Sequence, residues 1–180
     1  MALDEADLVA RPTATRLWLV PVLSVLAGSA VTLLPIVATA PVLPPFGLLV
    51  ALGWRLLRPE MWPAWVALPL GLADDLIGGA PLGSAMTLWT VAFLGIDMAD
   101  HRPMWRDHWL DWWLASLAIT LCCVGGWAVA RFTAGGGPLW PVLPQLALSI
   151  LAFPPVARLC ARLDRWRLGR WRPLLRRRAR

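Results

Sequence analysis

The sequence predicts an all-α polytopic membrane protein, with about six transmembrane helices in one bundle and both termini in the cytoplasm. Of the 180 residues, 58% are hydrophobic and 16% are charged, whereas a soluble domain carries roughly 25% charged residues. Residues 17–54 contain no charged side chain and no histidine. The arginines, moreover, fall almost entirely on one side of the predicted membrane.

The uncharged run over residues 17–54 is too long for one span. At about 1.5 Å per residue, a single helix over this run would be nearly twice as long as the roughly 30 Å hydrocarbon core is thick. Pro41, Pro44 and Pro45 break it, because proline removes a backbone donor and clashes with the preceding helical turn. The run therefore predicts two helices that double back.

The same test applied downstream gives six candidate spans. They lie near residues 17–37, 42–57, 61–79, 81–99, 109–130 and 138–158. The second is short and the third is interrupted. A four-span arrangement, with 42–57 and 61–79 as re-entrant pieces, is therefore a second interpretation.

Arginine placement gives the orientation. All 17 basic residues are arginine, and short cytoplasmic loops retain arginine while translocated loops lose it. With the N-terminus inside, the six-span arrangement leaves only Arg131 in an outside loop. This asymmetry predicts a multi-pass protein of the bacterial inner membrane. We expect no cleavable signal, because Asp4, Glu5 and Asp7 occupy the place of a positive n-region.

We expect three regions and no extramembrane domain. These are a cytoplasmic segment over residues 1–16, a transmembrane bundle over 17–158 and an arginine-rich cytoplasmic tail over 159–180. Apolar residues recur in the tail at three- and four-residue spacing, which indicates a helix at the membrane surface, where anionic lipid attracts arginine. The candidate lipid contacts are Arg158, Arg162, Arg165, Arg176, Arg177 and Arg178. Nucleic-acid binding is an alternative for 176–178, but topology alone demands a basic cytoplasmic end, and we expect no nucleic-acid partner.

The sharpest motif is Gly-Leu-Ala-Asp-Asp-Leu-Ile-Gly-Gly-Ala-Pro-Leu-Gly, residues 71–83. It places Asp74 and Asp75 in an apolar stretch at the outer end of the third span, and an ionised group in a membrane is costly and by default a candidate site. The functional interpretations are a proton or cation site, a polar substrate site, or a hydrogen-bonded anchor for a partner. The structural interpretation is that one aspartate caps the free amides that begin the fourth span.

Small residues follow the aspartates. Gly78, Gly79, Pro81 and Gly83 predict a tight reversal into the fourth span, where small side chains permit close backbone approach. No catalytic pattern accompanies the acids. An intramembrane aspartyl protease needs a second carboxylate on another helix, and a phosphatidyl-alcohol transferase needs a longer ladder of aspartates. We therefore expect no enzymatic activity.

Other reactive side chains carry weaker signals. His101 and His108 are seven residues apart among carboxylates, a spacing compatible with a metal, but a solvated loop with loosely paired charges explains them better. The cysteines show no metal-binding spacing. We expect no metal and no cofactor. Five tryptophans near span ends indicate a partial aromatic belt: Trp54, Trp62, Trp105, Trp109 and Trp140.

The stretch from Pro44 to Gly83 resembles the rod shape-determining protein MreD family. The order of residues that carries the resemblance is Pro44-Pro45, Trp54, Arg58-Pro59, Pro63, Trp65, Gly71-Leu72, Asp75, Gly79 and Pro81-Leu82-Gly83. Asp75 matches the single aspartate of the family by spacing, and Asp74 is additional. The segments after Gly83 resemble the family only in hydrophobic pattern.

The resemblance implies a non-enzymatic inner-membrane scaffold subunit of the machinery that builds lateral-wall peptidoglycan. Its partners would be the bitopic protein MreC and, indirectly, MreB, RodA and an elongation transpeptidase. The implied partner or structural motif is Gly71, Asp75, Gly79, Pro81 and Gly83.

The family's bundle is similar to the substrate-binding subunits of energy-coupling transporters, so the alternative is a small-molecule-binding transporter subunit. It would require a closed polar cavity on the outer side. The sequence favours the scaffold, because the predicted outer half offers few polar groups to a solute.

Overall fold

The computed structural model describes residues 14–33, 43–100, 108–135 and 137–169. Within these ranges the chain is all-helical, as predicted, and has no strand. The α-helices are α2 (Ala14–Ala30), α4 (Phe46–Leu57), α5 (Ala67–Gly78), α6 (Ser84–Asp100), α7 (His108–Ala134) and α8 (Val142–Gly169). Three short 3₁₀ helices are η1 (Val31–Leu33), η2 (Pro59–Met61) and η3 (Ala64–Val66).

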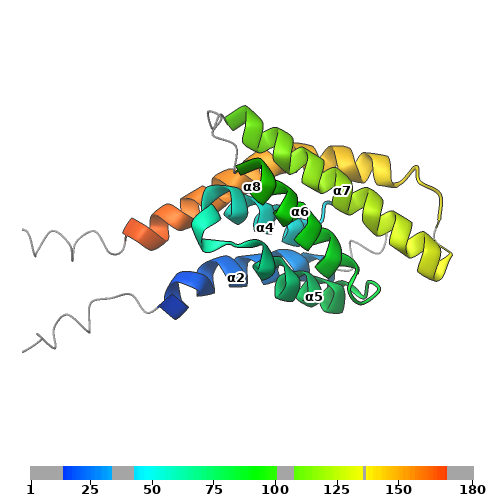
Figure 1. Cartoon of the computed structure of the whole chain (residues 1–180), viewed down its shortest axis with the longest axis horizontal. Coiled ribbons are helices and arrows are strands. Elements are labelled where there is room, and N and C mark those ends of the chain that lie inside the picture. The colour runs from blue at the N-terminus through cyan, green and yellow to red at the C-terminus, as the bar shows by residue number, and fades with distance from the viewer. Residues whose placement is uncertain (1–13, 34–42, 101–107, 136, 170–180) are drawn as a thin grey trace, which may run out of the picture.

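The helices run between two ends of one bundle (Figure 1). One end holds the start of α2, the α4–α5 connection and the end of α8, and we call it the arginine end. The other holds the α5–α6 turn and the α7–α8 connection, and we call it the turn end. Hydrogen bonds tie both ends: Arg58 Nη2 donates to Asp164 Oδ2 at 2.8 Å, and Gln145 Nε2 donates to the Leu43 carbonyl at 3.0 Å.

Helix α4 forms the centre of the core. Nine of its 12 residues are buried, as expected for a short helix that is apolar on nearly all sides. Its Trp54 is fully buried and donates through Nε1 to Ser24 Oγ of α2 at 2.8 Å. Trp62, just past η2, is also fully buried and stacks on Trp18.

Two of the five tryptophans expected in an aromatic belt are buried instead. Trp54 and Trp62 lie in the core, where both contact α2. Trp109 and Trp140 are exposed at the helix ends, where an interfacial ring is expected. Trp105 lies outside the described residues.

Two glycines let helices cross at close range. A Cβ on Gly28 of α2 would lie 3.0 Å from the Phe46 carbonyl carbon at the start of α4. A Cβ on Gly71 of α5 would lie 2.6 Å from the Met86 Cα of α6. The α2–α4 and α5–α6 pairs thus pack backbone against backbone, the mode that small residues permit.

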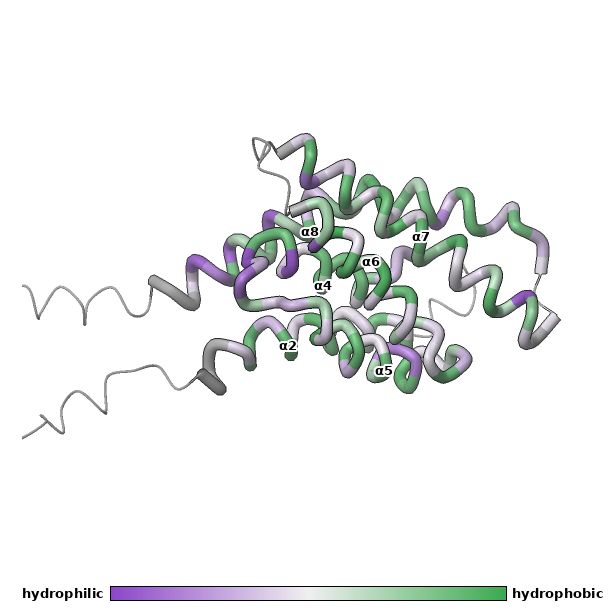
Figure 2. Tube along the Cα trace, in the orientation of Figure 1, coloured by the Kyte–Doolittle hydropathy of each residue, from purple (hydrophilic) through white to green (hydrophobic). Residues whose placement is uncertain are grey.

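Helix lengths differ from the expected spans. Helices α7 and α8 contain apolar segments of 25 residues each, Trp109–Thr133 and Val142–Trp166, long enough to cross a membrane. Helices α2, α4 and α6 supply shorter apolar segments, and α4 and α5 have 12 residues each, about 18 Å at the usual rise. Figure 2 shows apolar residues along the helices and hydrophilic ones gathered toward the end of α8.

The last helix continues past residue 158, where the sequence suggested the end of the bundle. Helix α8 runs unbroken through Pro154 and Pro155 to Gly169. Cys160 and Asp164 are buried, and a Cβ on Gly53 of α4 would lie 3.1 Å from the Cys160 sulfur. Residues 159–164 thus pack on α4. Three of the candidate lipid contacts lie in or beside this segment and are exposed: Arg158, Arg162 and Arg165. The other three, Arg176, Arg177 and Arg178, lie outside the described residues.

Candidate functional site

Asp75 lies at the end of α5 and caps the beginning of α6. Its side chain is 1% exposed. Four donors approach it: Oδ1 accepts from the Ser84 hydroxyl at 2.8 Å and the Ala85 amide at 2.9 Å, while Oδ2 accepts from the Gly83 amide at 2.9 Å and the Met86 amide at 3.4 Å. The structural interpretation of the motif, a carboxylate that satisfies free helical amides, is the observed geometry for Asp75.

Two left-handed glycines make the turn that brings Asp75 to these donors. Gly79 ends α5 at φ 66°, and Gly83 precedes α6 at φ 93°. Side chains rarely adopt such φ values, so glycine is the residue that fits. Between them, Pro81 accepts a hydrogen bond from the Ser84 amide at 3.0 Å. The reversal predicted over residues 78–83 therefore has defined geometry.

The close approach of helices occurs at Gly71 and not at the turn. A Cβ on Gly71 would meet the Met86 backbone, whereas a Cβ on Gly78, Gly79 or Gly83 would meet no atom within 4 Å. Residues 78–83 therefore make no close contact of their own inside the described bundle, and their outer surface is open. Gly71, about two helical turns before Gly78, supplies the packing contact.

Open space above the turn is bordered by apolar side chains. Leu76 is 65% exposed and Leu82 is 71% exposed. We call the exposed group at the turn end the glycine-turn surface; it consists of Leu76, Gly78, Gly79, Pro81 and Leu82. The buried Asp75 side chain lies under this surface, and its hydrogen bonds to the start of α6 fix the shape of the surface.

Asp74 points toward different neighbours. Its carboxylate lies beside the Ser29 hydroxyl at the end of α2 and beside Gly47 at the start of α4, where a Cβ would be 2.8 Å from Asp74 Oδ1. The Ser29 hydroxyl is buried and makes no hydrogen bond of good geometry in the described structure. Three helices thus meet at a small polar contact, and the additional aspartate is directed into the bundle rather than onto the glycine-turn surface.

The arginine end contains ion pairs that the sequence did not reveal. Arg55 of α4 is 2% exposed and pairs with Asp97 of α6, which is 31% exposed. Arg58, at the end of α4, donates from both Nε and Nη2 to Asp164 of α8. Asp97 is part of a packed helix pair, because α6 continues through it and brings it to a buried guanidinium.

No cluster of three or more metal-ligating side chains occurs among the described residues. His101 lies outside them, and so does the side chain of His108.

The chemistry at the turn end is therefore hydrogen bonding and shape. Because Asp75 is shielded from solvent and accepts from four donors at the start of α6, it orders the turn.

Comparisons of the chain with protein-family models, with curated proteins and with solved structures find no match.

Proposed function

We propose that the chain is a membrane-embedded scaffold subunit of the MreD type, without catalytic activity of its own. In this proposal it binds the transmembrane or membrane-proximal part of an MreC-type bitopic protein. Through that partner it connects to MreB, RodA and the elongation transpeptidase of lateral-wall peptidoglycan synthesis in the bacterial inner membrane.

Membrane embedding is supported by what the bundle exposes. Large apolar side chains cover the outside of α7 and α8, including Leu117, Phe132 and Leu151, and a soluble monomer rarely shows so continuous an apolar surface. The α4–α5 hairpin supports six spans over four. Arg55, in the last turn of α4, pairs with Asp97 in the last turn of α6. The hairpin therefore extends as far toward the arginine end as α6 does.

Orientation is supported by the same contacts. The described arginines other than Arg131 lie toward the arginine end, with the ends of α4 and α8. If retained arginine marks the cytoplasm, this end faces inward and the glycine-turn surface faces outward, where an MreC-type protein carries its main domain.

The main support for the proposal is the structural role of the residues that resemble the MreD family. Gly71 forms the α5–α6 crossing, Asp75 caps α6, and Gly79 and Gly83 adopt the left-handed turn. The segment by which the chain resembles the MreD family thus builds one rigid turn with an open apolar surface. Such a surface suits a protein partner, which small residues allow to approach closely.

The transporter alternative has less support. It requires a polar cavity at the outer side, formed by the carboxylates, but Asp75 is buried and occupied by α6, and Asp74 is directed to Ser29 and Gly47. A large cavity with mainly apolar walls lies elsewhere, toward the arginine end.

Co-purification of an MreC-type partner from membranes tests the proposal. The decisive variant is Gly78→Leu, because Gly78 is exposed, has ordinary helical φ and has no neighbour within 4 Å. A Cβ atom at this position meets no atom of the chain within 4 Å, so the leucine side chain extends outward from the glycine-turn surface. We expect it to reduce the co-purified partner at least about tenfold, as a protruding side chain at the centre of an interface does.

Gly95→Leu is the matched control. Gly95 is also exposed and unobstructed, but it lies midway along α6, away from the turn. It should retain the partner. Equal retention by both variants would remove the glycine-turn surface as the docking site, and absence of any MreC-type partner from wild-type membranes would overturn the scaffold proposal.

A further inference from the structure

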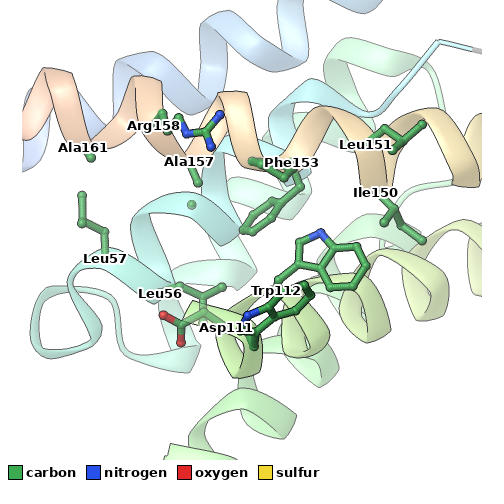
Figure 3. A pocket seen from close by; sticks show the side chains of 13 residues that line it. Leu56, Leu57, Asp111, Trp112, Ile150, Leu151, Phe153, Ala157, Arg158 and Ala161 are labelled. Carbon is green, nitrogen blue, oxygen red and sulfur yellow. The ribbon is translucent and has the colours of Figure 1, made fainter. Parts of the chain in front are cut away.

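A cavity of about 940 Å³ lies between α4, α7 and α8, toward the arginine end. Its walls are mainly apolar. Figure 3 shows Phe153 of α8 and Trp112 of α7 reaching into it from opposite sides, and Leu56 of α4 beside Asp111. The volume falls in the range of roughly 300–1,000 Å³ that is typical of ligand sites.

The walls limit what fills this space. The space is open along one side of the bundle, so it is a groove that the surrounding medium fills and not a sealed void. Water is a poor occupant of apolar walls because it finds too few hydrogen-bonding partners there. Hydrocarbon is the medium that matches Leu56, Trp112, Ile150 and Phe153.

The length of the cavity distinguishes a lipid chain from a helix. On α8 it extends from Ile150 to Ala161, about 17 Å at the usual helical rise and close to half of the roughly 30 Å hydrocarbon core. A transmembrane helix of a partner would need a groove along the whole core. An acyl chain needs one leaflet.

Charge at the cavity matches a phospholipid headgroup. Arg158 of α8 lines it, and Asp111 of α7 lies on the opposite wall (Figure 3). Arg162 and Arg165 follow Arg158 at helical spacing and are exposed. A phosphate is attracted to the α8 wall.

We propose that this groove binds one inner-leaflet phospholipid, with an acyl chain between α7 and α8 and its phosphate at Arg158. The inference rests on the membrane embedding and orientation of the proposed function, but not on the MreC-type partner. It assigns a lipid site to the arginine end, opposite the glycine-turn surface.

Native mass spectrometry of the full chain in detergent tests the site. Delipidated protein is titrated with dioleoylphosphatidylglycerol, with dioleoylglycerol as the phosphate-free arm and inorganic phosphate as a competitor. We expect one saturable phosphatidylglycerol, weaker binding of dioleoylglycerol and no competition by phosphate. Binding of dioleoylglycerol as strong as that of phosphatidylglycerol would overturn the headgroup assignment, and displacement by inorganic phosphate would overturn the lipid.

Two variant pairs locate the site. Ala161→Leu fills the groove, and Ala147→Leu adds the same side chain to an exposed position of α8 outside it. Arg158→Gln removes the proposed phosphate ligand, and Arg131→Gln removes an exposed arginine at the turn end that does not line the groove. We expect Arg158→Gln to weaken phosphatidylglycerol binding about fivefold, which corresponds to about 1 kcal/mol, and Ala161→Leu to weaken it more.

Equal binding by Ala161→Leu and Ala147→Leu would reject the groove. The two proposals fail separately, because the groove and the glycine-turn surface lie at opposite ends. If the MreC-type partner co-purifies but no saturable lipid binding is found, the lipid site alone is rejected. If lipid binding is saturable and is weakened by Arg158→Gln but no partner co-purifies, the lipid site is supported and the scaffold proposal is rejected.

Discussion

Gly71 of α5 and Met86 of α6 meet backbone to backbone. A Cβ atom on Gly71 would lie 2.6 Å from the Met86 Cα and 2.7 Å from its amide nitrogen. Neither of these atoms belongs to a flexible side chain, so the helices themselves would have to separate. This contact fixes how α6 lies on α5 and therefore where Asp75 meets the amides that it caps.

Replacement of Gly71 by alanine should destabilise the bundle. The added methyl group overlaps the α6 backbone, and such overpacking costs about 1–3 kcal/mol of unfolding free energy. Thermal unfolding in detergent, followed by tryptophan fluorescence, measures the loss. Gly78→Ala on the same helix is the control, because its methyl group meets no atom within 4 Å. A Gly71→Ala protein as stable as Gly78→Ala would contradict the close crossing.

Removal of the Asp75 carboxylate should loosen the start of α6. Asp75→Ala deprives four donors of their acceptor and should cost at least about 1–2 kcal/mol, the scale of a lost helix cap. Asp75→Asn keeps one acceptor oxygen and should be milder. Hydrogen exchange of the Ala85 and Met86 amides reports the local effect.

Asp74→Asn is the matched control for the cap. Asp74 is adjacent in sequence, but its neighbours are Ser29 and Gly47 rather than α6. Its replacement should leave the exchange of the Ala85 and Met86 amides unchanged. Faster exchange of these amides in Asp74→Asn than in Asp75→Asn would mean that the cap had been assigned to the wrong aspartate.

The sequence predicted the helical class, the doubling back near Pro44 and the reversal over residues 78–83, because local signals carry them: apolar length, proline and glycine. It also offered a cap as one use of the aspartates. Spacing could not say that Gly71 rather than the turn glycines makes the close contact, because all are small and only the packed structure distinguishes them. Trp54 was misplaced for a related reason, since α4 is apolar all around and its burial depends on its neighbours.

The pairing of Arg55 with Asp97 is the clearest example of what local pattern omits. The two residues belong to helices that are separated in sequence by the α4–α5 connection and α5. The expected spans 42–57 and 81–99 both end on the cytoplasmic side of the six-span arrangement, and Arg55 and Asp97 lie near those ends. The partner of a buried guanidinium, however, is a matter of helix packing, which no spacing rule specifies.

Neutralising Asp97 should destabilise the fold more than replacing Arg58 in the neighbouring pair with Asp164. Asp97→Asn removes a carboxylate from a guanidinium that is 2% exposed, and because Asp97 is itself partly accessible we expect a loss of about 1–3 kcal/mol, below the full cost of a broken buried pair. In the Arg58–Asp164 pair the arginine is 36% exposed and the carboxylate 7% exposed. Arg58→Gln should cost less, because the glutamine amide can still donate to the buried carboxylate. Unfolding midpoints in detergent compare the two.

A double replacement distinguishes the pair from the individual side chains. Arg55→Met with Asp97→Leu removes both charges and leaves apolar side chains between α4 and α6. Because apolar substitutes often match a buried ion pair in stability, the double variant should be more stable than Asp97→Asn alone. If the double variant loses as much unfolding free energy as the single variants Arg55→Met and Asp97→Leu lose in sum, the two residues act independently.

Cysteine accessibility should reveal opposite sides for the two ends of the bundle. Gly137, in the exposed α7–α8 connection, and Arg165, exposed on α8, lie at the turn end and the arginine end. With the arginine end inside, Gly137→Cys should react with a membrane-impermeant maleimide in intact spheroplasts, and Arg165→Cys only after permeabilisation. The unmodified chain is the background control, because Cys122 and Cys160 are buried and Cys123 is partly buried. Reaction of both variants in intact spheroplasts would contradict the membrane-spanning arrangement, and reaction of Arg165→Cys alone would invert the orientation and put the glycine-turn surface on the cytoplasmic side.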